Sequence, residues 1–223
     1  MRPEHVAVWH GFIDDLRDAE YEVWNGCQSG HRQLDATSVA PTTRRRVFAV
    51  AVRKGMFAEG DAPEWPCLDE DVSWEDSQSR PFPPVWPCLD TDPDTIWPAG
   101  MVWPDADFRR FSEPQVQRDG SIVLGRMDPS KYPDNNRVFD PKGPCPTLRA
   151  QYAKCEPPGR TTNLWLVNGQ VRNLSVQECL RIHGFPAEAL EGVPTPAAYK
   201  MVGDSVCVPV ARGLLRTVIR LLS

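Results

Sequence analysis

The sequence contains no apolar run of about 18 residues and no signal-peptide pattern at its N-terminus. These two absences predict a cytoplasmic protein that does not span a membrane. Its seven cysteines include no C-x-x-C pair of the kind that binds zinc, and their odd number fits a reducing compartment. We therefore expect no metal site, and we interpret the cysteines as small buried side chains.

Basic residues are scarce in one segment and plentiful elsewhere. The chain of 223 residues has a net charge of −5, which argues against a simple DNA-coating protein. Between Glu59 and Asp107, thirteen acidic residues stand against a single basic one, Arg80, whereas the remainder carries 24 Lys and Arg against 17 Asp and Glu. Most of the protein can therefore face a polyanion, and the acidic segment cannot.

The stretch from residue 172 to the C-terminus carries the clearest structural signals. Ser175, followed three residues later by Glu178, is a capping box that starts a helix, and Gly184 ends this helix. After a short link, apolar residues recur at helical spacing up to the C-terminus. This pattern predicts an amphipathic closing helix that the chain enters through a glycine turn at Gly203.

Other segments predict further elements. Apolar residues at three-and-four spacing predict a helix over 6–19, and residues 21–24 predict a short strand. Residues 41–52 predict a strand that is buried on both faces, as in a parallel or mixed sheet, because an unbroken apolar run follows three arginines. The pair Asn168-Gly169 between apolar flanks predicts a hairpin.

Residues 59–104 are rich in proline, tryptophan and acid, and they contain the run W-P-C-L-D twice, at 65–69 and 86–90. Prolines at this density exclude a regular helix or a central strand. We interpret the segment as a loop or a short repeated hairpin that is packed by its own tryptophans or is partly disordered.

Residues 172–186 and 199–210 resemble the ninth and tenth sequence blocks of DNA cytosine-5 methyltransferases. The first run follows the family's R-x-L/F-S/T-x-x-E-x-x-R-L-Q-G-F-P, and the second follows Y-K-Q-x-G-N-A/S-V-x-x-P-V. Two such blocks in this order form a specific signal. The chain departs from it at His183, where the family has Gln, and at Asp204, where the family has Asn.

The three arginines of residues 41–48 resemble the family's eighth block, P-Q-x-R-x-R-V-F, with Thr42 at the position of Gln. The resemblance implies that Arg46 contacts the flipped cytosine and supports the catalytic glutamate, and that Arg44 helps to hold the site and the DNA backbone. In an extended chain Arg44 and Arg46 point to the same side. The alternative interpretation is a solvated strand edge.

Residues 136–148 resemble the run N-R-V-Y-D-P-x-G-x-x-P-T-L near the end of the family's target recognition region. Arg137, Lys142 and Arg149 are our candidates for phosphate contacts with double-stranded DNA, together with Lys154 and Arg160. Candidates for contacts with base edges are Asn135, Asn136 and Gln151. Ordinary loop polarity is the alternative for most of these residues.

The tenth block implies a site for S-adenosyl-L-methionine, because in this family the turn lies beside the methionine end of the cofactor. Asp204, Ser205 and Val206 are the cofactor-binding candidates, at a turn where a helix N-terminus would offer N–H groups to a carboxylate. The negative charge of Asp204 should weaken such binding unless this residue pairs elsewhere.

Two parts of the family's machinery are missing from the sequence: the F-x-G-x-G cofactor loop and the Pro-Cys-Gln nucleophile. We reject Cys67 and Cys88 as nucleophiles, because both follow the arginine block and have acidic neighbours that would raise the pKa of a thiol. The leading hypothesis is therefore the C-terminal half of a split DNA cytosine-5 methyltransferase, active only with a second subunit. The alternatives are a non-catalytic DNA-binding or regulatory remnant, and an acidic insert that mimics DNA charge.

The expected fold class is α/β: a partial doubly wound, Rossmann-like methyltransferase domain with an inserted irregular β-rich recognition domain. Residues 1–57 and 173–223 are expected to form the partial methyltransferase domain. Residues 58–107 are expected to form the acidic insert, and residues 108–172 the target recognition region. Half of a parallel sheet leaves an open edge, so a partner chain or self-association is expected.

Overall fold

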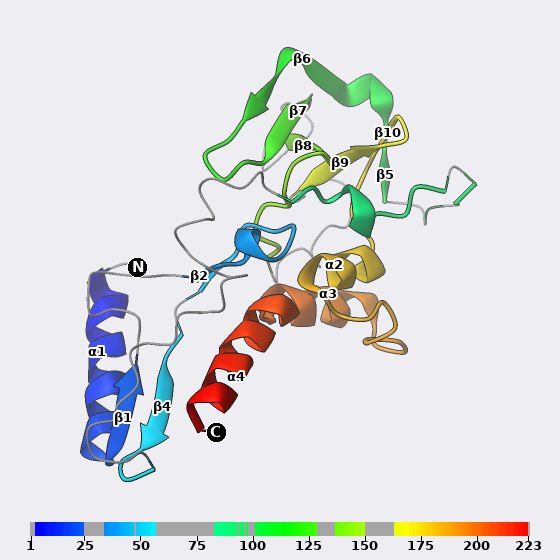
Figure 1. Cartoon of the computed structure of the whole chain (residues 1–223). Coiled ribbons are helices and arrows are strands. Elements are labelled where there is room, and N and C mark those ends of the chain that lie inside the picture. The colour runs from blue at the N-terminus through cyan, green and yellow to red at the C-terminus, as the bar shows by residue number, and fades with distance from the viewer. Residues whose placement is uncertain are drawn as a thin grey trace.

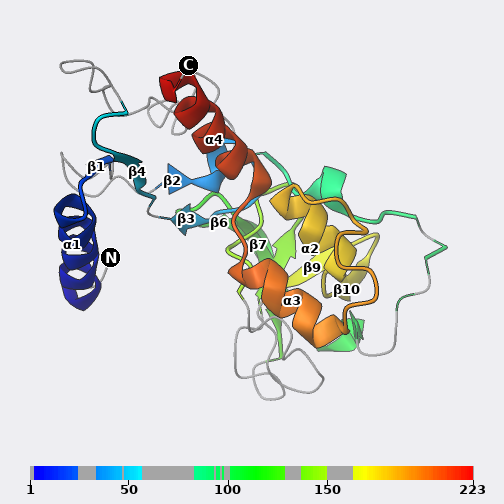
Figure 2. The ribbon, with the colours of Figure 1, turned by 90° about the horizontal axis from the view of Figure 1, so that it is seen from below.

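The computed structural model describes residues 3–24, 34–46, 48–56, 83–92, 94–95, 97, 101–128, 137–149 and 163–222. It consists of an N-terminal helix with a strand pair, a six-stranded sheet, and three C-terminal helices (Figure 1). In two perpendicular views the N-terminal part stands apart from the sheet, and the last helix extends toward it (Figure 2). No helix of the described residues is both long and apolar enough to cross a membrane.

The N-terminal part contains helix α1 (Pro3–Asp18), strand β1 (Tyr21–Trp24) and strand β4 (Val50–Arg53). β1 and β4 pair antiparallel, with Tyr21 opposite Arg53. The helix predicted over 6–19 and the strand predicted over 21–24 are both confirmed, because the apolar spacing of α1 and the β-branched and aromatic residues of β1 are local signals.

The single buried strand predicted over 41–52 is wrong. This segment forms two short strands: β3 (Arg45–Arg46) pairs with β2 (Leu34–Asp35), and β4 pairs with β1. Only Val52 of β4 is buried. Both faces of a strand are covered only inside a larger sheet, and among the described residues each of these pairs is a sheet of two strands.

The six-stranded sheet has the order β5-β10-β9-β8-β7-β6. β8 and β9 are parallel, and the other neighbours are antiparallel. This mixed sheet together with the C-terminal helices confirms the α/β fold class. Its strands are β5 (Val102–Trp103), β6 (Phe108–Val116), β7 (Ile122–Met127), β8 (Arg137–Asp140), β9 (Leu164–Val167) and β10 (Gln170–Arg172).

The hairpin predicted at Asn168-Gly169 joins β9 and β10 and is confirmed. The two turn residues have φ values of 50° and 80°. Positive φ at both central positions suits an Asn-Gly pair, and it matches the twist of the flanking strands. The edge strand β5 pairs with β10 and comes from within the segment 58–107, whose boundaries stay predictions.

The C-terminal helices are α2 (Val176–His183), α3 (Thr195–Asp204) and α4 (Val208–Leu222). The capping box at Ser175 is confirmed, and Gly184 ends α2 in the left-handed conformation at φ 80°. The glycine turn predicted at Gly203 is wrong. Gly203 lies in the last turn of α3, and the link to α4 is formed by residues 205–207, because Ser205 caps α3 through its backbone N–H.

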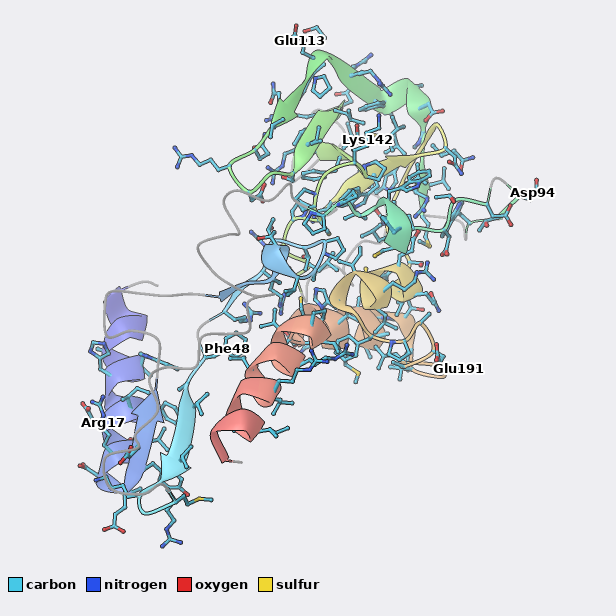
Figure 3. All side chains as sticks on the ribbon, in the orientation of Figure 1. Arg17, Phe48, Asp94, Glu113, Lys142 and Glu191 are labelled. Carbon is cyan, nitrogen blue, oxygen red and sulfur yellow. The ribbon has the colours of Figure 1, made fainter. Side chains whose placement is uncertain are left out.

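The main core lies between one face of the sheet and α2. It unites Phe139 and Trp165 of the sheet with Leu180 of α2. A second cluster joins the segment around the short helix Ala36–Ser38 to Val210 of α4. Phe48 packs against this second cluster and lies between β4 and α4 (Figure 3). Residues 36–48 and α4, which are far apart in the sequence, therefore share a core.

Candidate functional site

Arg44 lies where three distant segments of the chain meet. Its Nη1 donates a hydrogen bond to the carbonyl oxygen of Leu148 at 3.0 Å, and its Nη2 donates to the carbonyl oxygen of Gly203 at 2.7 Å. Its side chain is buried. One guanidinium group therefore ties the segment around residue 44 to Leu148 and to the last turn of α3.

The backbone around Arg44 is anchored independently of this side chain. The N–H of Thr43 donates to the carbonyl oxygen of Cys145 at 2.8 Å, and the N–H of Cys145 donates to the carbonyl oxygen of Pro41 at 2.8 Å. Thr147 donates its hydroxyl hydrogen to the carbonyl oxygen of Thr43. These bonds align residues 41–44 with residues 145–148 and so fix the place from which Arg44 reaches Gly203.

The electrostatics of Arg44 follow from its burial. Burial lowers the pKa of the Arg44 guanidinium, and the neighbouring charge of Arg46 lowers it further. Arg44 faces backbone carbonyl groups rather than solvent. Arg46, by contrast, is exposed.

The link between α3 and α4 holds Ser205 in a closed set of hydrogen bonds. Its N–H donates to the carbonyl oxygens of Met201 and Val202 at 3.0 and 3.2 Å, and its hydroxyl donates to Val202 at 2.8 Å. Nδ1 of His183 lies 3.0 Å from the same hydroxyl oxygen. Since the hydroxyl hydrogen points to Val202, Nδ1 of His183 carries the hydrogen of this contact.

The predicted cofactor residues do not by themselves fit a negatively charged ligand end. Both hydrogen-bond donors of Ser205, its backbone N–H and its hydroxyl, bond to carbonyl oxygens of α3. The carboxylate of Asp204 accepts a hydrogen bond from Lys200 at 2.7 Å, so this residue does pair elsewhere. Val206 contributes no polar side chain. The side chains of these three residues therefore offer no free hydrogen-bond donor to the charged end of such a cofactor.

A second polar cluster is buried between the sheet and α2. Glu178 receives two hydrogen bonds from Arg172, at 2.6 and 2.8 Å. It also accepts from the N–H groups of Ser175 and Asp90, at 2.7 and 2.8 Å. The guanidinium carbon of Arg172 lies 3.9 Å from the ring centre of Trp97. This bidentate ion pair joins the last strand of the sheet to the first turn of α2.

The second W-P-C-L-D run docks on α2, which sequence reasoning missed. It includes the short helix Trp86–Cys88, and Leu89 is buried in the main core. Arg181 donates from Nε to the carbonyl oxygen of Cys88 at 2.8 Å and from Nη2 to the carboxylate of Asp90. The sequence signal was present, because the repeat supplies a carboxylate and the ninth block supplies an arginine, but their proximity depends on tertiary structure.

The cysteines of this region are poor nucleophiles. Burial raises the pKa of the Cys88 thiol, Arg181 lowers it, and Glu178 raises it again. Burial raises the pKa of Cys145 well above its usual range. A thiol is nucleophilic only as the thiolate, so the main reason against Cys88 is burial rather than the acidic setting. Cys67 lies outside the described residues.

The predicted DNA-binding residues that the structure describes lie along residues 137–149. Arg137 begins β8, and its guanidinium lies 5.5 Å from the ring centre of Phe139. Lys142 is exposed in the turn after β8 (Figure 3), and Arg149 is exposed farther along the chain. The candidates outside the described residues are Asn135, Asn136, Gln151, Lys154 and Arg160.

Comparison with known proteins identifies the family. A family model described as C-5 cytosine-specific DNA methylase matches residues 105–220. The chain belongs to this family. The match covers the six-stranded sheet from β6 onward and all three C-terminal helices. Among curated proteins, the Type II methyltransferase M.NlaIV of Neisseria lactamica is 28% identical over 107 residues, which are 48% of this chain and 22% of that protein.

Solved methyltransferase structures share the fold. The Dnmt2 methyltransferase of S. pombe has a TM-score of 0.60 at 14% identity, covering 97% of this chain and 64% of that one. A putative DNA modification methyltransferase encoded within a prophage of E. coli has a TM-score of 0.54 at 18% identity, covering 100% of this chain and 66% of that one. The chain thus spans less than two thirds of the length of these relatives.

His183 replaces the glutamine of the family's ninth block, and its burial makes a testable prediction. Burial lowers the pKa of His183 to about 4, and the charges of Arg44 and Arg46 contribute. The unfolded chain therefore binds one proton more between pH 6.5 and 4, so the free energy of unfolding falls as the pH decreases through this window, by roughly 3 kcal/mol in all.

The prediction is measured by urea denaturation at several pH values. His183→Gln cannot titrate, so the stability difference between parent and variant should shift in favour of the variant as the pH falls from 7 to 4.5. A difference that stays constant across this range would mean that His183 is protonated as easily in the folded chain as in the unfolded one.

Proposed function

We propose that this chain is the recognition and closing part of a DNA cytosine-5 methyltransferase. It binds double-stranded DNA and completes the site in which a methyl group passes from S-adenosyl-L-methionine to C5 of cytosine. A second polypeptide supplies the cofactor loop and the nucleophilic cysteine. Within this chain, Arg46 faces the target base and Arg44 positions the segments around it.

The observation that carries the proposal is the position of Arg44. The arginine segment, the recognition region and the end of α3 lie far apart in the sequence, and this one side chain joins them. The same segments carry the resemblance to the eighth and tenth blocks of the family, so the parts that a methyltransferase site requires from its C-terminal half lie together. The exposed Arg46 lies two residues from this junction.

The need for a partner is supported by surfaces that this chain leaves uncovered. Leu215 and Ile219 of α4 are 61% and 64% exposed, and Val8 and Phe12 of α1 are 73% and 49% exposed. Large exposed apolar side chains, here on both α1 and α4, favour an interaction site. The chain also covers less than two thirds of its structural relatives, which leaves room for a separate cofactor-binding part.

The test is a mixing experiment with labelled S-adenosyl-L-methionine and double-stranded DNA. This chain alone is expected to transfer no methyl group to DNA, and activity should appear when a second polypeptide with the F-x-G-x-G loop and the Pro-Cys-Gln motif is added. Leu215→Asp with Ile219→Asp should abolish the gain while the variant stays folded, because these exposed positions serve only the partner. No activity with any such polypeptide would refute the split enzyme.

One observation favours the alternative, a non-catalytic DNA-binding remnant. Ser205 has no donor left for a ligand, and Asp204 places a carboxylate at the turn where the family has Asn. A remnant would bind DNA with unchanged affinity whether or not the second polypeptide is present. A split enzyme would bind DNA more tightly in its presence.

A further inference from the structure

Three arginines stand in one row across the six-stranded sheet. Arg109 of β6 is the register partner of Arg126 of β7, and Arg126 is the register partner of Arg137 of β8. Residues that face each other on neighbouring strands project to the same face of a sheet. We call Arg109, Arg126 and Arg137 the arginine row. Neighbouring strands lie about 4.8 Å apart, so the row spans about 10 Å.

The register that creates the row is fixed by close packing of β6 against β7. Gly125, next to Arg126, faces Arg110, and a Cβ atom at Gly125 would lie 2.3 Å from the carbonyl oxygen of Arg109 and 2.7 Å from the ring of Phe108. Only glycine allows this approach. Because a slip by one residue would turn every side chain to the opposite face, Gly125 helps to hold the row in place.

The row is poorly compensated by nearby charge. Arg109 is 67% exposed, and its Nη2 lies 3.6 Å from Oδ2 of Asp128, which is a long ion pair. Arg126 is exposed, and it forms no ion pair within the described part of the chain. Like charges that face each other across strands are destabilising. The fold thus carries a local electrostatic cost, which binding of a polyanion would remove.

The row lies on a definite face of the sheet. Arg137 and Phe139 lie two positions apart on β8 and so project to the same face, and Phe139 belongs to the core that α2 covers. The opposite face carries the second sheet core, which includes Met127 and Val138. The row therefore lies on the sheet face that packs against α2.

We propose that the arginine row is a phosphate-binding site for the backbone of double-stranded DNA. The proposal deepens the proposed function and rests on it for the choice of DNA as the polyanion. Duplex DNA carries one charge for about every 3.4 Å of axis in each strand, so a row of this length can meet successive phosphates. Contacts of this kind position the duplex and carry no base preference.

The test is the affinity of the whole chain for a short fluorescent duplex, measured by anisotropy over a range of salt concentrations. Arg126→Gln is expected to weaken binding roughly tenfold and to reduce the slope of log K against log salt by about 0.9, and the triple Gln variant of the row by about 2.7. Both effects should be equal for duplexes of unrelated sequence. Arg53→Gln, an exposed strand arginine outside the recognition region, is the control and should leave the slope unchanged.

Thermal unfolding separates phosphate binding from a structural role of the row. Because the arginines repel one another in the free chain, Arg126→Gln should unfold at a higher temperature than the parent at low salt, whereas loss of a stabilising arginine would lower the unfolding temperature. An unchanged salt slope in the triple variant, or a lower unfolding temperature of Arg126→Gln, would overturn the proposal. The anisotropy experiment measures DNA binding without methyl transfer, so its result does not depend on the mixing experiment. If the arginine row does not bind phosphate, the proposal of a split enzyme still stands.

Discussion

Glu178→Ala is expected to lower the free energy of unfolding by about 3–5 kcal/mol. The carboxylate is completely buried and receives two hydrogen bonds from Arg172. Its removal leaves the guanidinium charge of Arg172 buried, with no other carboxylate bonded to it among the described residues. The N–H groups of Ser175 and Asp90 lose their acceptor as well. The measurement is urea denaturation of the purified chain.

A matched control and a compensating variant make this result specific. Asp14 forms an exposed ion pair with Arg17 at 3.4 Å, so Asp14→Ala should change stability by no more than about 0.5 kcal/mol. The double variant Arg172→Met with Glu178→Leu should be more stable than Glu178→Ala, because it buries no unpaired charge. A double variant that is as unstable as the single one would show that shape, not charge, holds the cluster.

The same loss should loosen the docked W-P-C-L-D run. Asp90 donates its N–H to Glu178, and its carbonyl oxygen accepts from Arg172, so the buried pair holds both backbone polar groups of the last residue of this run. Arg181 provides the remaining link. The acidic segment is thus fastened by the residues of the family's ninth block, and Asp90 serves as a ligand for arginine within the chain.

The elements that the sequence predicted correctly are those whose signals lie within a few residues of one another. The capping box at Ser175, the left-handed Gly184 and the Asn168-Gly169 turn each satisfy local backbone groups, so their conformations follow from adjacent side chains. The apolar spacing of α1 is local in the same sense.

The failures share a different cause. The run over 41–52 has the composition of a buried strand, but whether a strand is buried depends on neighbours that the described chain does not supply. Gly203 was expected to form a turn before the last helix. Instead it lies in the last turn of α3, and the helix ends two residues later, where Ser205 caps it. Glycine permits a turn without requiring one.

The site could be predicted in composition but not in arrangement. Arg44, Arg46 and Arg137 were identified from the family's blocks, and their roles stay predictions. The partners of Arg126 could not be identified in this way, because cross-strand register follows from the bulges and glycines of the sheet and leaves no local trace. The ion pair between Arg181 and Asp90 likewise joins two segments that are far apart in the sequence and meet only in the folded chain.

Arg44→Ala is expected to lower the free energy of unfolding by roughly 2–5 kcal/mol, since it leaves two buried carbonyl groups without donors. Arg44→Lys should recover only part of this loss, because one ammonium group cannot reproduce a fork that spans the carbonyls of Leu148 and Gly203. Arg53→Ala, at an exposed position of β4, should stay within about 0.5 kcal/mol of the parent. Denaturation curves of the three variants provide the comparison.

The pKa of His183 provides a second, local measurement of the same junction. The positive charge of Arg44 is the second largest cause, after burial, that lowers this pKa to about 4. Arg44→Ala should therefore raise the pKa of His183, which NMR titration of the imidazole would detect, whereas a variant that merely unfolded would show the ordinary value near 6.5. An unshifted pKa in a folded Arg44→Ala variant would contradict the junction, because Arg44 could not then lie near the residues that hold the α3 to α4 link.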